Sequence, residues 1–81
     1  MYKNKSEDGL NNICGAKIKA FRLAMPKKTS QRKLADLLQM QGLDLDKNAV
    51  QRIEAGTRFV TDIEIKTIAK VLGVSYTDLL D

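Results

Sequence analysis

The residues best suited to contact another molecule lie in segment 46–56, which reads Asp-Lys-Asn-Ala-Val-Gln-Arg-Ile-Glu-Ala-Gly. Asp46 is a favourable helix N-cap and Gly56 a favourable residue just past a helix end, so the segment predicts one short helix. Side chains with amide or cationic donors, which pair with adenine and guanine edges in the DNA major groove, share one face of this helix: Lys47, Asn48, Gln51 and Arg52. We interpret this face as a surface that reads DNA bases, although an ordinary surface helix also has one polar face.

The opposite face of the same helix is apolar and consists of Ala49, Val50 and Ile53. Leu45, before the cap, and Val50 stand at the two positions of a hydrophobic staple, which fixes how the chain leads into the helix. Packing this face against a core would turn the polar face outward.

Positive charge gathers in the N-terminal half of the chain. Residues 10–33 contain seven Lys or Arg and no Asp or Glu, whereas residues 34–81 contain five Lys or Arg and eight Asp or Glu. This asymmetry favours one surface for a polyanion and a different surface for another partner. Lysine-rich helices are also common as solvated surfaces, so charge alone leaves both interpretations open.

Composition argues against several classes of protein. The 81 residues suffice for one small domain, and 43% hydrophobic with 30% charged residues is ordinary for a soluble globular chain. One Cys and no His argue against a disulfide framework and against a zinc site. No apolar run has the length of a membrane span, and no signal peptide is evident, so we expect a cytoplasmic, nucleoid-associated protein.

Catalysis also lacks its usual parts. The chain has no His, its lone Cys14 lies on an apolar stripe, and it has no glycine-rich phosphate loop. Asp44 and Asp46 stand beside a predicted helix cap, which explains them without a catalytic role. We therefore expect no enzyme activity, no cofactor, no metal and no small-molecule ligand.

Four further helices are predicted from caps and apolar spacing, and no strand. We expect residues 1–9 to form a flexible arm and residues 10–81 one domain. The first helix starts at Asn11 or Asn12 and ends before Pro26, because the residue before a proline avoids helical angles. Ser30 is predicted to cap a second helix, which stops before Gly42. A capping box at 61–64 predicts the start of another helix, which Gly73 ends, and a weaker capping box at 75–78 predicts the start of the last one.

Three pieces of the chain together resemble the Cro/phage-repressor (XRE-type) helix-turn-helix family: Gln-Arg-Lys-Leu-Ala at 31–35, Val-Gln-Arg-Ile-Glu-Ala-Gly at 50–56, and Ile-Ala-Lys-Val-Leu-Gly-Val-Ser at 68–75. The resemblance runs from about Cys14 to Leu80. It implies an all-α, compact, five-helix, lambda-repressor-like domain of prokaryotic or phage origin, whose third helix enters the major groove. Residues 39–43 exceed the commoner form of the motif, as in a subset of the family with a lengthened second helix.

The resemblance also implies roles for individual residues. Lys47, Asn48 and Arg52 match base-reading positions, Gln51 is on the same face, and Ala49 could touch a thymine methyl group. Arg22 and Glu54 match a structural salt bridge behind the recognition unit. Phosphate contacts are expected from the start of the second helix, the basic residues near it and the loop after the third helix: Ser30, Gln31, Arg32, Lys27, Lys28, Thr57 and Arg58.

The sequence therefore predicts a sequence-specific DNA-binding transcriptional regulator, in particular a repressor that binds a double-stranded DNA operator as a homodimer. One short helix reads few base pairs, and two-fold pairing doubles the site. We expect the dimer contact near the last helix, unless its apolar residues only seal the core: Val74, Tyr76, Leu79 and Leu80. The alternatives are a protein-interaction module on the same fold, such as an antitoxin or an antagonist of a regulator, and a non-specific nucleoid protein.

Overall fold

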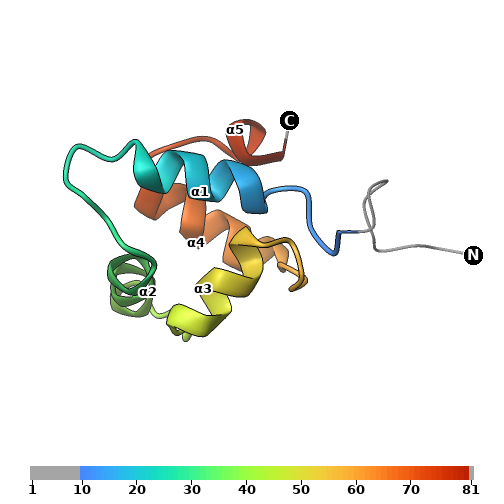
Figure 1. The fold of residues 1–81 in the computed structure, drawn as a ribbon, viewed down its shortest axis with the longest axis horizontal. Coiled ribbons are helices and arrows are strands. Elements are labelled where there is room, and N and C mark those ends of the chain that lie inside the picture. Colours follow the sequence, from blue (N-terminus) through green and yellow to red (C-terminus); the bar gives the residue numbers. More distant parts are fainter. Residues whose placement is uncertain (1–9, 81) are drawn as a thin grey trace, which may run out of the picture.

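Five helices account for the regular structure of residues 10–80, the part of the chain that the computed structural model describes (Figure 1). In chain order they are α1 (Gly15–Leu23), α2 (Gln31–Met40), α3 (Lys47–Glu54), α4 (Asp62–Leu72) and α5 (Tyr76–Leu80). No strand occurs within this range, and the predicted all-α class is confirmed. The expected flexible arm, residues 1–9, lies outside the described residues.

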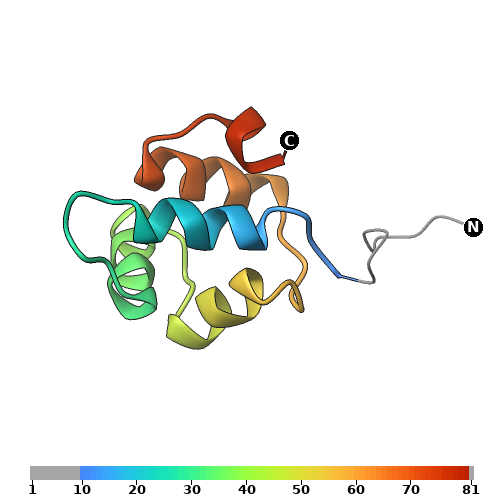
Figure 2. The same ribbon diagram turned by 45° about the horizontal axis from the view of Figure 1, so that its top comes forward.

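Helix α1 lies in the middle of the arrangement and contacts α3, α4 and α5. Figure 2 shows α1 running between α4 and α3, with α5 near the end of the chain. Helix α2 packs against α3 and α4. The pair α2 and α3 thus rests on a support made of α1 and α4.

The core receives side chains from all five helices and from the segments before α1 and α3. Leu45 and Val50, the predicted staple, are both buried in it, so the apolar face of α3 is anchored as expected. Among residues 10–80, the buried hydrophobic residues are Cys14, Ile18, Leu34, Ala35, Leu38, Leu45, Ala49, Val50, Ile53, Ile68, Ala69 and Leu79.

Side-chain caps fix the starts of three helices as predicted. The Ser30 hydroxyl accepts from the backbone N–H of Lys33 at 3.0 Å, and the Asp46 carboxylate accepts from that of Ala49 at 2.8 Å. Thr61 and Glu64 form the expected capping box of α4. Glycines with positive φ follow α2, α3 and α4, namely Gly42, Gly56 and Gly73.

Helix α1 differs from its prediction because it starts at Gly15 rather than at Asn11 or Asn12. The two asparagine side chains instead bind backbone groups far along the chain, at Ile53, Thr57 and Arg58. Those hydrogen bonds hold segment 10–14 in a non-helical path. The helix also ends at Leu23, before the expected limit at Pro26.

Helix α5 starts at the predicted weak capping box, in which Ser75 and Asp78 exchange hydrogen bonds of 3.1 Å. Leu79 is fully buried. Its expected place in a dimer contact is therefore wrong, because its side chain fills the core. Tyr76 and Leu80 remain 50% and 39% exposed, and Val74 is half-buried against the core.

Candidate nucleic-acid interface

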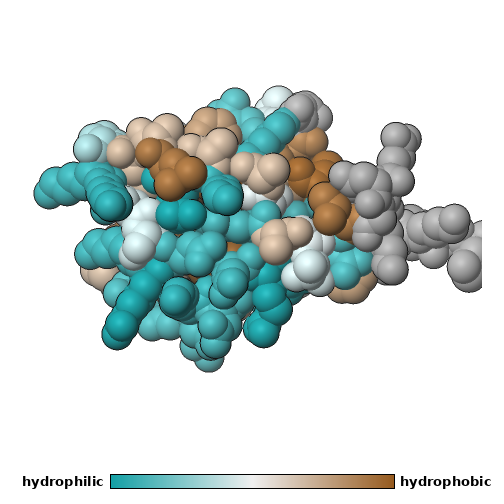
Figure 3. All heavy atoms as spheres, in the orientation of Figure 1, coloured by the Kyte–Doolittle hydropathy of each residue, from teal (hydrophilic) through white to brown (hydrophobic). Residues whose placement is uncertain are grey.

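The polar face of α3 is free on the outside of the molecule. Lys47, Asn48, Gln51 and Arg52 are all exposed, while Val50 and Ile53 on the opposite face are each 1% exposed. Figure 3 shows a continuous hydrophilic surface over the lower part of the molecule, where α2 and α3 lie, and the hydrophobic residues gathered mostly higher up. The sequence-predicted base readers therefore share one surface, with one exception.

That exception is Ala49, which belongs to the core. It is 6% exposed, and its backbone N–H is taken by the Asp46 cap. The expected contact between its methyl group and a thymine is corrected accordingly, because the methyl group packs inward. Only the four polar residues of α3 remain as candidates for reading bases.

Arg22 and Glu54 form the expected ion pair. Arg22 Nε–H donates to Glu54 Oε2 at 2.7 Å, and a second guanidinium nitrogen donates to Oε1 at 3.0 Å. The third donates to the backbone carbonyl of Thr29 at 2.8 Å, so the guanidinium joins α1, α3 and the α1–α2 connection. Hydrogen bonding to Glu54 raises the pKa of Arg22 above its ordinary value and keeps it charged. The two side chains are 8% and 2% exposed.

Gln31 joins this network instead of projecting freely from α2. Its side-chain amide donates to Glu54 Oε1 at 3.0 Å, which links the first residue of α2 to the last residue of α3. Because an amide nitrogen carries two protons, one stays available for a neighbouring acceptor. The bond to Glu54 therefore sets the direction in which Gln31 can donate. We name Arg22, Thr29, Gln31 and Glu54 the ionic network.

A groove of about 520 Å³ opens beside the ionic network. It brings the start of α2 together with Lys47, the first residue of α3. Two further cations line it, Lys28 from the α1–α2 connection and Arg32 from α2. The N-terminus of α2 adds backbone N–H groups and the positive end of its dipole. This basic groove suits a phosphate group, and it contains four of the predicted phosphate-contacting residues: Lys28, Ser30, Gln31 and Arg32.

Other predicted phosphate contacts are arranged differently. Lys27 is exposed but does not line the groove. Thr57 is exposed, and its hydroxyl donates to the carbonyl of Arg52 at 3.2 Å. The Arg58 guanidinium binds both carboxylate oxygens of Glu64 at 3.0 Å. This pairing argues against the expected phosphate contact of Arg58 and indicates that Arg58 stabilises the loop before α4.

Sequence reasoning missed a set of contacts from segment 10–15. Asn12 donates to the carbonyls of Ile53 at 3.1 Å and Arg58 at 2.7 Å, and its oxygen accepts from Gly15 N–H at 2.8 Å. Asn11 donates from its backbone to Gly56 and from its side chain to Thr57. We name segment 10–15 the N-terminal clamp. Asparagine side chains often bind nearby backbone groups in non-helical segments, and with a glycine close behind, that signal could have indicated a loop before the helix.

Within residues 10–80, no group of three or more His, Cys, Asp or Glu side chains is placed to hold a metal ion. Burial raises the pKa of the Cys14 thiol, which fits its predicted place in the core. In the same range, the helices are too short and too polar for any of them to cross a membrane.

Comparisons with known proteins agree with this geometry. A family model described as helix-turn-helix matches residues 18–79. The restriction-modification controller protein C.AhdI from Aeromonas hydrophila has a crystal structure with a TM-score of 0.66 to this chain and 31% sequence identity, covering 80% of this chain and 84% of that chain. Among curated proteins, none matches the sequence significantly. The chain belongs to the helix-turn-helix family of the Cro/phage-repressor (XRE) type, and it is a DNA-binding transcription regulator and not an enzyme.

Proposed function

We propose that the protein is a transcriptional repressor that binds a partly palindromic operator as a homodimer and reads its sequence with α3. The observation that carries this proposal is the exposed polar face of α3, formed by Lys47, Asn48, Gln51 and Arg52 on a helix whose other face is in the core. These side chains can donate to the acceptors of guanine and adenine in the major groove.

Affinity in this proposal comes mainly from phosphates bound in and near the basic groove. Lys28, Arg32 and Lys47 line the groove, Lys27 is exposed nearby in the chain, and the α2 N-terminus adds backbone donors. Cationic contacts release counterions from DNA and so bind any sequence. The proposal therefore assigns affinity to this groove and sequence choice to α3.

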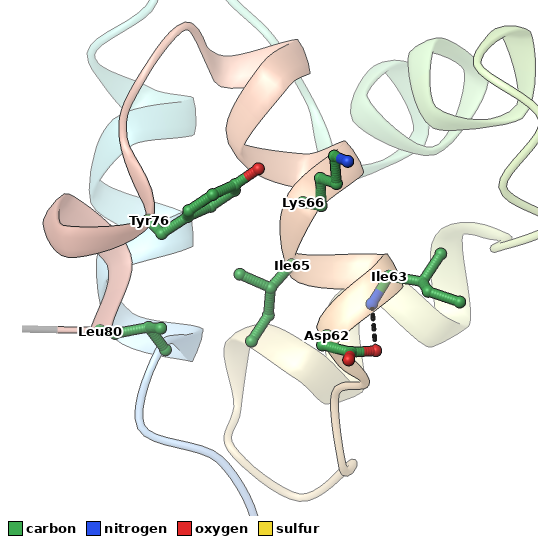
Figure 4. Close-up of a pocket in the computed structure, with 6 residues that line it drawn as sticks. All are labelled: Asp62, Ile63, Ile65, Lys66, Tyr76 and Leu80. Atoms are coloured by element: carbon green, nitrogen blue, oxygen red, sulfur yellow. Dashed lines mark hydrogen bonds between the residues drawn. The ribbon is translucent and has the colours of Figure 1, made fainter.

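The proposed dimer contact lies on the surface shared by α4 and α5. Figure 4 shows Tyr76 and Leu80 from α5 and Ile65 from α4 lining a groove, whose volume is about 390 Å³. Ile63, on the rim, is 70% exposed. A second copy would remove this apolar surface from water. Reading two half-sites would require the two α3 helices of such a dimer to lie roughly 34 Å apart.

The exposed face of α3 also distinguishes this proposal from a protein-interaction module on the same fold. Such a module is expected to present apolar side chains on α3, whereas this helix presents two cations and two amides. Likeness to a restriction-modification controller supports a narrower version, in which the regulated genes belong to a restriction-modification system. We propose that the protein acts in the cytoplasm, where its DNA target lies.

Selection of bound duplexes from a random pool tests the function directly. We expect a two-fold symmetric consensus, and a reporter placed behind that consensus should lose expression when the protein is present. Recovery of no consensus would contradict sequence-specific regulation and favour a non-specific nucleoid protein. A gain in reporter expression would contradict the repressor assignment.

Two substitutions separate base reading from phosphate binding. We expect Arg52→Ala to weaken binding to the selected duplex by about 1–3 kcal/mol and to leave binding to a scrambled duplex nearly unchanged. Lys28→Ala should weaken both by similar amounts, because phosphates are present in every sequence. Equal losses on both duplexes for both variants would contradict the division of roles.

Sedimentation tests the dimer. Leu80→Asp places a charge in the proposed contact and should reduce the mass to that of a monomer, while Thr77→Asp on the same helix serves as the control. A folded Leu80→Asp protein that keeps the mass of the wild type would place the contact elsewhere.

A further inference from the structure

Two groups of contacts converge on the C-terminal end of α3, and one of them is the ionic network, which binds the Glu54 carboxylate. The N-terminal clamp binds the same end. Asn12 donates to the carbonyl of Ile53, inside the last turn of α3, and to that of Arg58, beyond it. The last carbonyls of a helix have no partner within the helix, so an outside donor can hold them in place.

Close packing strengthens this attachment. A Cβ atom added to Gly15 would collide with the carbonyl oxygen of Ile53 and lie 3.1 Å from that of Glu54, so the start of α1 touches the backbone of α3 directly. Gly56, which follows α3 with φ of +81°, has the side chain of Leu10 beside it. Asn11 N–H donates to the Gly56 carbonyl at 2.7 Å. Through Asn11, Asn12 and Gly15, the clamp therefore contacts the backbone of α3 and its loop.

We infer that Asn12 is a positioning residue for DNA reading: by fixing the C-terminal end of α3, it sets the tilt at which Lys47, Asn48, Gln51 and Arg52 meet the bases. Base readout needs donors placed closely, whereas phosphate contacts by flexible lysines tolerate a small shift. Loss of Asn12 should thus reduce discrimination between sequences more than overall affinity. The inference rests on the proposed function, since it assigns a role within sequence-specific binding.

Asn12→Asp is the sharpest variant. The carboxylate has the shape of the amide and can still accept from Gly15 N–H, but it turns the donor toward Ile53 and Arg58 into an acceptor facing two carbonyls. Asn12→Ser is the milder second variant, because its hydroxyl can donate to only one carbonyl. Ile68→Val is the matched control: it lowers stability through the core, and Ile68 belongs to neither the clamp nor the ionic network.

The experiment measures the affinity of each protein for the selected duplex and for a scrambled duplex, at a temperature where circular dichroism shows every protein folded. For Asn12→Asp we expect the ratio of the two affinities to fall about tenfold, with scrambled binding nearly kept, and for Ile68→Val an unchanged ratio. An unchanged ratio for both Asn12 variants would overturn the inference. Failure of both variants to fold would also overturn it, because Asn12 would then serve the whole fold.

A measurement without DNA separates this inference from the proposed function. Amide NMR signals of residues 47–52 should shift in Asn12→Asp, because a rigid helix moves as a unit; the hydrogen bonds of Asn12 go to Ile53, Arg58 and Gly15 and not to these residues. Shifts confined to residues 10–15 and 53–58 would overturn the positioning role. If instead the wild type shows no preference for any duplex while residues 47–52 shift as expected, the proposed function fails and the structural role of Asn12 stands.

Discussion

Helix α3 is held near its C-terminal end by two attachments of opposite chemical character. The ionic network is charged and grips a side chain, since Arg22 and Gln31 both bind the Glu54 carboxylate. The N-terminal clamp is neutral and grips the backbone, through Asn12 and through direct contact at Gly15. Both join α3 to α1 or to the segment just before it, so the reading helix is fixed twice to the same support.

The two attachments differ in how much the folded state is destabilised when one partner is removed. A buried charge without its partner keeps its full desolvation cost, so breaking the ionic network should lower the free energy of unfolding strongly. Removing a neutral amide leaves no buried charge, and the Ile53 carbonyl still accepts from Gly56 N–H at 3.0 Å. We expect the ionic network to control mainly stability and the clamp to control mainly the placement of α3.

The largest effect is expected for Arg22→Ala. This change leaves Glu54 buried, at 2% side-chain exposure, without its cation, and should lower the free energy of unfolding by about 3 kcal/mol. Urea titrations measure it, and Lys19→Ala, an exposed change in the same helix, provides the control. Equal urea midpoints for the two variants would contradict a stabilising role of the ionic network.

Gly15→Ala tests the clamp by crowding instead of deletion. The added methyl group would meet the Ile53 carbonyl, a backbone group that cannot rotate away, so the start of α1 and α3 must separate. Overpacking of this kind costs about 2 kcal/mol. The control is Ala16→Gly, an exposed change one residue along α1, and thermal melts compare the two proteins. A Gly15→Ala protein as stable as the wild type would show that the close contact yields easily.

The two attachments were not equally predictable from the sequence. The Arg22–Glu54 pair was expected because a family resemblance supplied both positions, which are 32 residues apart. The clamp joins residues 41 and 46 apart through backbone carbonyls, which have no sequence signature. Asn11 and Asn12 instead entered the prediction as the start of the first helix, since asparagine is a common helix cap.

The helices themselves were predictable because their ends are marked by side chains. Ser30, Asp46 and Thr61 cap their helices as expected, and local rules suffice for such contacts. Burial near the ends of apolar stripes was harder to predict. Ala49 was expected on the apolar face of its helix and also, from the family resemblance, against a thymine methyl group, and Leu79 was expected either in a dimer contact or sealing the core. Both lie in the core, and helices of eight and five residues offer few positions from which to define the edge of an apolar face.

A smaller effect should come from Gln31→Ala, which removes one hydrogen bond to the Glu54 carboxylate. We expect a loss of about 1 kcal/mol, since Arg22 still compensates the charge. Gln39→Ala is a closely matched control: Gln39 is in the same helix and also donates at 3.0 Å, but to the neutral carbonyl of Leu45. If Gln39→Ala costs as much as Gln31→Ala in urea titrations, the charge of Glu54 adds nothing to the bond.

The smallest effect concerns Arg58 and Glu64, which brace the loop that the clamp binds through the Arg58 carbonyl. Hydrogen bonding to Arg58 lowers the pKa of Glu64 below its ordinary value. Glu64 therefore binds a proton more weakly in the folded chain than in the unfolded one. The contribution of the Glu64 carboxylate to the free energy of unfolding is fully present above the pKa of glutamate in the unfolded chain, about 4.3. It disappears as the pH falls through the lower pKa that Glu64 has in the folded state.

Because Arg58 is 29% exposed, solvent screens the pair, and we expect it to contribute only about 0.5–1 kcal/mol at neutral pH. Glu64→Gln keeps the shape of the side chain but removes this pH dependence. The difference in unfolding free energy between the wild type and Glu64→Gln should shrink as the pH is lowered from about 6 to about 3. A difference that stays constant over this range would mean that the charge of Glu64 is irrelevant to the loop. The neutral clamp alone would then hold the loop. In that case, adding Asn12→Asp to the Glu64→Gln protein should make residues 56–60 more mobile by the same amount as adding it to the wild type.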